Sequence, residues 1–191
     1  MAIRRVGVVG CGLMGSGIVE VAARGGYDVV VREVTDDLLH AGLGRVEGSM
    51  RRGVERGKLA AADMEAARAR IQGTTTLADL ADVDLVVEAV IEQMAPKQAV
   101  FRELDGLCPP RTLFASNTSS LSITEMAAVT GRPERFVGMH FFNPVPVMKL
   151  VELIRGYQTS DETMAAARAF AESVGKTVVV CKDSPGFIVN L

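Results

Sequence analysis

Short β-branched runs alternate with segments of helical periodicity along the chain. The run Val6–Val9 ends at a glycine and predicts a buried strand, and the segment Leu13–Arg24, which stops at Gly25-Gly26, predicts a helix. A second apolar run, Tyr27–Arg32, predicts another strand. A strand, a helix and a parallel strand within about 30 residues form one βαβ unit.

The pattern changes after Thr35. This residue precedes two aspartates, which is a signal for a helix N-terminus. Apolar residues then recur at helical spacing as far as Val54, and a second helical segment, 61–71, follows Gly57. We expect a helical hairpin inserted between strands. It carries a group of basic side chains, namely Arg45, Arg51, Arg52, Arg56 and Lys58.

The rest of the chain continues the alternation. It predicts an α/β fold with a Rossmann-type, doubly wound and mostly parallel sheet, into which the helical hairpin is inserted. The expected strands are 74–77, 84–89, 112–116, 136–140, 149–154 and 177–181. The expected helices are 97–107, 122–129 and 161–173, and the prolines of Asn143–Pro146 predict a rigid loop.

The 191 residues correspond to one full domain and the start of another, at about 150 residues per domain. We expect residues 1–183 to form the nucleotide-binding domain. Residues 184–191 predict a linker, Ser184-Pro185-Gly186, followed by the apolar beginning of a further domain that this chain lacks.

Composition and charge exclude several classes of protein. A formal net charge of −2 argues against broad nucleic-acid binding, and 2 histidines are too few for a His-rich metal site. The 3 cysteines are scattered, which is typical of free thiols in a reducing compartment. The apolar run before Cys11 is shorter than the roughly 7–15 residues of a signal peptide, and no apolar run reaches the about 18 residues of a membrane span. We therefore expect a soluble cytoplasmic protein with no membrane or nucleic-acid partner and no metal.

A glycine-rich turn follows the first strand. Gly10, Gly12 and Gly15 fit the pattern GxGxxG, with Leu13 and Met14 inside it. Between a strand and a helix of a βαβ unit, these glycines allow a tight turn, a close approach of pyrophosphate and close helix packing. The turn therefore predicts a dinucleotide cofactor at the helix N-terminus. A plain strand-to-helix turn is the alternative.

Glu33 ends the second predicted strand. A carboxylate at this position accepts the ribose hydroxyls of NAD and repels a 2′-phosphate, so it favours NAD. Arg32 beside it leaves NADP open as an alternative.

His140 follows a predicted strand and precedes a Pro-rich loop. The carboxyl end of a parallel strand is where α/β enzymes place reacting groups, and an imidazole exchanges a proton near neutral pH. Glu152 lies on the next predicted strand. If the two strands are neighbours, its carboxylate can fix the tautomer of the ring. A histidine satisfied within the core is the alternative reading.

Five segments together carry a resemblance to a known family. They are VGVVGCGLMGSGI, DLVVEAVIE, SNTSSLSI, GMHFFNPVPVMKLVE and DSPGFIVN. Over essentially its whole length the chain resembles the N-terminal NAD-binding domain of 3-hydroxyacyl-CoA dehydrogenases, and most resembles bacterial 3-hydroxybutyryl-CoA dehydrogenases. The resemblance implies reversible, NAD-dependent oxidation of (S)-3-hydroxyacyl-CoA.

The resemblance also implies roles for the active-site residues. His140 is expected to take the proton of the 3-hydroxyl group, and Glu152 to orient it. Ser119 is expected to bind the substrate oxygen, Asn143 to contact the substrate, and Asn190 to be the family's remaining active-site asparagine. Without the family, Ser119 is more simply a helix N-cap.

Cofactor and coenzyme A contacts are implied in the same way. Glu92, Lys97 and Asn117 are expected to contact NAD, and Ser49 and Arg56 to touch coenzyme A. The alternative for Lys97 is an exposed residue in the first helical turn after Pro96. The alternative for the hairpin is a solvated basic face. Relatives carry an all-helical second domain that closes the substrate side and forms a homodimer, so we expect the same partner arrangement when that domain is present.

Two other functions stay open on the sequence. One is a non-catalytic NAD(H)-binding module, and the other is a dehydrogenase of a hydroxy acid that is not bound to coenzyme A.

Overall fold

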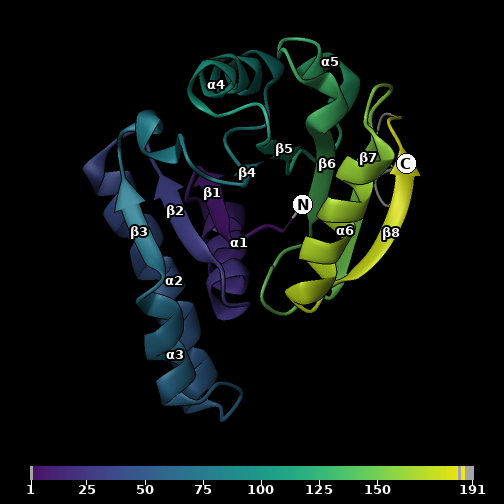
Figure 1. Ribbon diagram of the computed structural model, residues 1–191. Helices are drawn as coiled ribbons and strands as arrows, with labels where there is room; N and C mark the ends of the chain where they lie inside the picture. Colours follow the sequence, from purple (N-terminus) through teal and green to yellow (C-terminus); the bar gives the residue numbers. More distant parts are fainter. Residues whose placement is uncertain (1, 185, 188–191) are drawn as a thin grey trace.

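A computed structural model describes residues 2–184, 186 and 187. Its centre is a sheet of 8 strands in the order β3-β2-β1-β4-β5-β6-β7-β8 (Figure 1). All neighbouring strands are parallel except β6 and β7, which are antiparallel. The strands are β1 (Arg5–Val9), β2 (Asp28–Arg32), β3 (Ile71–Thr74), β4 (Leu85–Glu88), β5 (Leu113–Ser116), β6 (Phe136–Phe141), β7 (Leu150–Arg155) and β8 (Thr177–Lys182).

Helices cover both faces of this sheet, which is the predicted Rossmann-type architecture. They are α1 (Leu13–Arg24), α2 (Asp36–Glu55), α3 (Ala61–Arg68), α4 (Met94–Leu107), α5 (Ile123–Ala127) and α6 (Asp161–Ser173). In Figure 1, α2 and α3 form the inserted hairpin beside β2 and β3, and α6 lies at the β6–β8 end. Thr35 caps α2 as predicted, because its side chain accepts the backbone N–H of Leu38.

Alternate residues of the central strands enter two separate cores. Val8 packs with α1 and α6 residues in one core, whereas Val9 packs with α4 and α5 residues in the other. Because successive side chains of a strand point to opposite faces, a strand covered on both sides is apolar throughout. This is why the runs at β1, β2 and β4 were recognisable in the sequence.

The strand predicted at 74–77 is wrong in position. β3 spans Ile71–Thr74, α3 ends at Arg68, and Leu77–Leu80 forms a 3-10 helix. Leu77 and Leu80 are both buried, and Asp79 accepts a hydrogen bond of 2.6 Å from the Thr74 hydroxyl. The run of three threonines mimics a strand, but its last two residues lead into this turn.

Helix α4 begins at Met94 rather than at 97. Pro96 lies in its first turn, where the backbone N–H groups have no partner within the helix, so a proline is tolerated there.

The C-terminal end of the described chain is tied to the loop before α5. Asp183 accepts hydrogen bonds from the Ser122 hydroxyl at 2.9 Å and from the backbone N–H groups of Ile123 and Thr124 at 2.9 and 2.7 Å. Burial acts to raise the pKa of Asp183, but these hydrogen bonds outweigh it and the pKa is lowered. The predicted linker and second-domain segment, 184–191, falls mostly outside the described residues, and so does Asn190.

None of the helices within the described ranges is both long and apolar enough to cross a membrane.

Candidate active site

The glycine-rich turn between β1 and α1 has the geometry expected for a dinucleotide site. Gly10 has φ +94°, and a Cβ there would lie 2.6 Å from the carbonyl oxygen of Ala89. A Cβ on Gly15 would collide with the carbonyl oxygen of Gly10, whereas a Cβ on Gly12 would meet no protein atom within 4 Å. Gly10 and Gly15 are therefore required by the protein's own packing. Gly12 keeps open the space in which a pyrophosphate approaches the backbone.

This difference predicts separate effects for two alanine substitutions. Gly15→Ala should lower the free energy of unfolding by about 1–3 kcal/mol, because a methyl group is forced against backbone. Gly12→Ala should leave it within about 0.5 kcal/mol and weaken NAD⁺ binding about tenfold through lost access of the phosphates. Urea unfolding and calorimetric titration with NAD⁺ measure the two quantities. Unchanged NAD⁺ affinity of Gly12→Ala would show that the nucleotide binds elsewhere.

Glu33 lies beside this turn, at the end of β2. Its Oε1 accepts the backbone N–H of Cys11 at 2.5 Å, and its Oε2 accepts that of Val34 at 3.1 Å. Arg32 turns toward the segment after β3, since its Nε donates to the carbonyl oxygen of Thr75 at 3.4 Å. The carboxylate is thus placed for a ribose, with the arginine engaged beside it. The turn and Glu33 fit an NAD cofactor.

His140 and Glu152 meet across the antiparallel pair β6–β7. They are direct partners in the strand register, and His140 Nδ1 lies 2.8 Å from Glu152 Oε2. His140 is 7% and Glu152 1% exposed. The rings of Phe142 and Phe187 lie 4.4 and 6.1 Å from the imidazole, measured between ring centroids. The histidine is therefore held in a fixed orientation by a carboxylate and two aromatic rings.

A cavity of about 650 Å³ opens beside this pair, and we call it the central cavity. His140 lines it together with Met14 of the glycine-rich turn, so the imidazole faces the same space as the nucleotide-binding turn. Other lining residues are Glu92, Lys97, Asn117, Ser119 and Asn143. The central cavity is therefore lined by Met14 and by six further residues that were expected to contact the cofactor or the substrate.

Asn117 and Ser119 come from the turn after β5. Asn117 Oδ1 accepts the backbone N–H of Phe141 at 2.9 Å, which ties this turn to the end of β6. Ser119 donates to Glu92 Oε1, from its backbone N–H at 2.6 Å and from its hydroxyl at 3.0 Å. Ser122, not Ser119, caps α5. The cap role that competed for Ser119 in the sequence analysis thus belongs to another serine.

Glu92 is held as an anion at the wall of the central cavity. The Thr118 hydroxyl donates to Glu92 Oε1 at 2.6 Å, and Lys97 Nζ lies 3.2 Å from its Oε2. Partial burial raises the pKa of this carboxyl, but the hydrogen bonds from Thr118 and Ser119 and the charge of Lys97 outweigh burial. The net pKa of Glu92 is lowered.

Lys97 is 1% exposed and pairs with Glu88, whose exposure is 0%. Sequence reasoning missed Glu88, and it allowed Lys97 to be an exposed residue of the first helical turn. The sequence did contain a signal for Glu88, because this carboxylate ends the apolar strand β4. Charged residues are almost never fully buried unless they are paired, so a carboxylate at such a position indicates a buried partner.

Two further cavities lie along the loop after β6. The second cavity, of about 480 Å³, is lined by Ser49 and Arg52 of α2 and by both Asn143 and Pro146. The third cavity, of about 610 Å³, is lined by Pro146, the α2–α3 turn, the end of α1 and the α6–β8 turn. Asn143 therefore lines both the central and the second cavity, and Pro146 lines both the second and the third.

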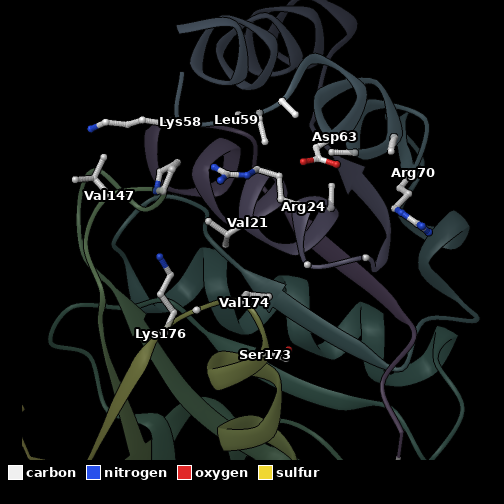
Figure 2. Close-up of a pocket in the computed structure, with 18 of the residues that line it drawn as sticks. Val21, Arg24, Lys58, Leu59, Asp63, Arg70, Val147, Ser173, Val174 and Lys176 are labelled. Atoms are coloured by element: carbon white, nitrogen blue, oxygen red, sulfur yellow. The ribbon is translucent and has the colours of Figure 1, made fainter. Parts of the chain in front are cut away.

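The third cavity is cationic. Arg24, Lys58, Arg70, Lys149 and Lys176 line it, with Asp63 as the acidic residue among them. Figure 2 shows Arg24, Lys58 and Lys176 on one side of this cavity, around Val147. Burial and the nearby Arg24 charge lower the pKa of Lys176, although Glu20 opposes them. Arg56 is exposed on the α2–α3 turn, two positions before Lys58. Its contact with coenzyme A stays a prediction.

All three cysteines are buried free thiols. Across the described ranges, no group of three or more His, Cys, Asp or Glu side chains could hold a metal ion.

Comparisons with known proteins show the family of the chain. Residues 5–184 match the family model described as "3-hydroxyacyl-CoA dehydrogenase, NAD binding domain". A probable 3-hydroxybutyryl-CoA dehydrogenase of Bacillus subtilis is 48% identical over 190 residues, which cover 100% of this chain and 66% of the relative. A 3-hydroxybutyryl-CoA dehydrogenase of Bradyrhizobium diazoefficiens is 47% identical, covering 98% of this chain and 64% of the relative.

A solved structure shows the same similarity in three dimensions. The crystal structure of (S)-3-hydroxybutyryl-CoA dehydrogenase from Ralstonia eutropha superimposes with a TM-score of 0.96 at 48% identity, covering 98% of this chain and 66% of that one. The chain thus spans about two thirds of the length of these relatives. On its sequence, fold and site, the chain belongs to the 3-hydroxyacyl-CoA dehydrogenase family and matches its NAD-binding domain.

Proposed function

We propose that this chain provides the cofactor site and the general base for NAD-dependent, reversible oxidation of (S)-3-hydroxyacyl-CoA to 3-oxoacyl-CoA. The proposed substrate is a short-chain thioester, 3-hydroxybutyryl-CoA, in keeping with the names of the relatives in Bacillus subtilis and Ralstonia eutropha. The observation that carries the proposal is the 2.8 Å contact of Glu152 with Nδ1 of His140, a residue that lines the central cavity.

His140 and Glu152 have separate roles in removing the proton. With Nδ1–H donated to Glu152, the other ring nitrogen, Nε2, carries the lone pair that takes the proton of the 3-hydroxyl group. The carboxylate holds this tautomer and stabilises the imidazolium that forms. When NAD⁺ is bound, it accepts the hydride that leaves C3. The alcohol thereby loses one proton and one hydride and becomes the ketone.

Polar groups on the same wall hold the substrate oxygen and chain. Ser119 and Asn143 line the central cavity, which supports a role for both residues in contacting an oxygen presented to His140. A substrate group held by such contacts reacts faster, because its translational and rotational entropy is lost on binding, before the chemical step.

The row of three cavities supports an acyl-CoA rather than a free acid as the substrate. A thioester placed at His140 would send its pantetheine arm past Asn143 into the second cavity, beside Ser49 and Arg52. The phosphorylated end would then reach the third cavity, where Arg24, Lys58 and Lys149 carry positive charge. Arginine and lysine are the side chains that bind phosphate in proteins.

Two rival functions give different results in one assay. The chain is mixed with NAD⁺ and (S)-3-hydroxybutyryl-CoA, and NADH formation is followed by its absorbance, with the (R) thioester and free 3-hydroxybutyrate as controls. We expect NADH with the (S) thioester and almost none with the controls. Bound NAD⁺ without turnover, both by this chain and by one extended beyond Leu191 with a C-terminal domain, would indicate a non-catalytic module. Turnover of the free acid at the rate of the thioester would indicate another hydroxy-acid dehydrogenase.

A further inference from the structure

A fully buried ion pair lies directly behind Glu92. Glu88, at the end of β4, has 0% exposure, and Lys97, on α4, has 1%. Lys97 Nζ donates to Glu88 Oε1 at 2.6 Å and lies 3.2 Å from Glu92 Oε2. The three side chains therefore form a row that leads from the interior to the central cavity, and it ends at Glu92, whose side chain is 39% exposed.

Glu88 is fixed in place by its other contacts. Its Oε1 also accepts the backbone N–H of Val90 at 2.7 Å, and its Oε2 accepts the Ser116 hydroxyl at 2.6 Å. Donors from β5, α4 and the β4–α4 loop therefore occupy both oxygens of this carboxylate. Burying an ion pair of this kind costs free energy.

The formal charges of the three side chains indicate what Glu88 contributes to the cavity wall. Glu88, Lys97 and Glu92 carry −1, +1 and −1, so the row has a net charge of −1 at the cavity. Without Glu88, Lys97 and Glu92 would cancel and the cavity wall would be neutral. Glu88 thus removes the effect of Lys97 and leaves the charge of Glu92 uncompensated where it faces the cavity.

We propose that Glu88 is a positioning residue that makes the cavity wall negative, so that the site binds the cationic nicotinamide of NAD⁺ in preference to the neutral ring of NADH. The proposal rests on the function proposed above, in which C3 gives its hydride to NAD⁺ beside His140, so that the nicotinamide would lie in the central cavity. A negative charge close to the ring stabilises NAD⁺ by Coulomb attraction and has little effect on NADH. The low pKa of Glu92 keeps this charge present at neutral pH.

The test measures the dissociation constants of NAD⁺ and NADH for this chain by calorimetry, at constant ionic strength. Glu88→Gln should lower the ratio Kd(NADH)/Kd(NAD⁺) about tenfold, mainly by weakening NAD⁺. The amide keeps the shape of the side chain, and the Ser116 hydroxyl can turn to accept from it. Glu47→Gln is the control for overall charge, because Glu47 lies on α2 in an exposed pair with Arg51.

A double variant separates the charge effect from a structural one. In Glu88→Gln/Lys97→Met both buried charges are gone, and Glu92 again leaves −1 at the cavity. We expect the ratio to return to the value of the unaltered chain or higher, although two buried contacts have been lost. A structural role for Glu88 predicts no recovery of the ratio, since the damage of two packing changes would add.

The outcomes are distinct. Equal weakening of NAD⁺ and NADH in Glu88→Gln, or no recovery in the double variant, would overturn the inference while leaving the proposed function intact. Failure of the unaltered chain to bind either nucleotide would overturn both. If Glu88→Gln does not fold by circular dichroism, the double variant and Glu92→Gln decide. Glu92→Gln removes the charge at the cavity itself and should lower the ratio at least as much.

Discussion

Alanine in place of His140 should lower kcat for oxidation of (S)-3-hydroxybutyryl-CoA by about 10²–10⁴-fold, which is the usual contribution of a general base. Affinity for NAD⁺ should stay nearly unchanged, because the nucleotide is expected to bind at the turn Gly10–Gly15 and at Glu33, whose contacts within the described chain do not involve the imidazole. Steady-state kinetics and calorimetric NAD⁺ titration measure the two quantities on the same preparation.

His40→Ala provides the matched control for this experiment. His40 is the other histidine of the chain and is exposed on α2, so its loss should change neither kcat nor NAD⁺ affinity. A parallel fall of turnover and NAD⁺ affinity in His140→Ala would show that His140 supports the structure of the site rather than the chemistry.

Glutamine in place of Glu152 should also cost about 10²–10⁴-fold in kcat, even though it preserves the size of the side chain. The carboxylate can only accept from Nδ1–H, and so it places the free lone pair on Nε2. An amide can instead donate to Nδ1, which moves the ring proton to Nε2 and removes the base from the cavity. It also lacks the charge that stabilises the imidazolium.

This loss should appear in kcat with little change in KM, since Glu152 is 1% exposed and lies behind the histidine. Glu152→Asp keeps the charge at a greater distance and should retain more activity than Glu152→Gln. Full activity of Glu152→Gln would contradict the proposed role of the pair. The exposed Glu172, on α6, supplies a control in Glu172→Gln, where no change is expected.

The sheet could be predicted because its central strands carry one unambiguous pattern. β1, β2 and β4 are apolar on both faces, and β-branched residues dominate them. The segment around Thr74–Leu77 was misplaced because three consecutive threonines fit a strand as well as a turn. Only tertiary pairing of Ile71 with Val29 decides between them.

The site could be predicted only in part, for a related reason. The turn at Gly10–Gly15 follows from local rules, but the contact of His140 with Glu152 needs β7 to run antiparallel to its neighbour, which no local pattern indicates. Glu88 and Lys97 were harder still. Spacing alone cannot distinguish a lysine that meets a buried carboxylate from one that faces water, because the distinction depends on the partner strand.

The hydrogen bond from the Phe141 backbone to the Asn117 side chain joins the segment that carries His140 to the turn that carries Ser119. These two segments are thereby set at a fixed separation when the protein folds. The conformational entropy of these two segments is therefore lost once, during folding, and is not lost again at each binding event.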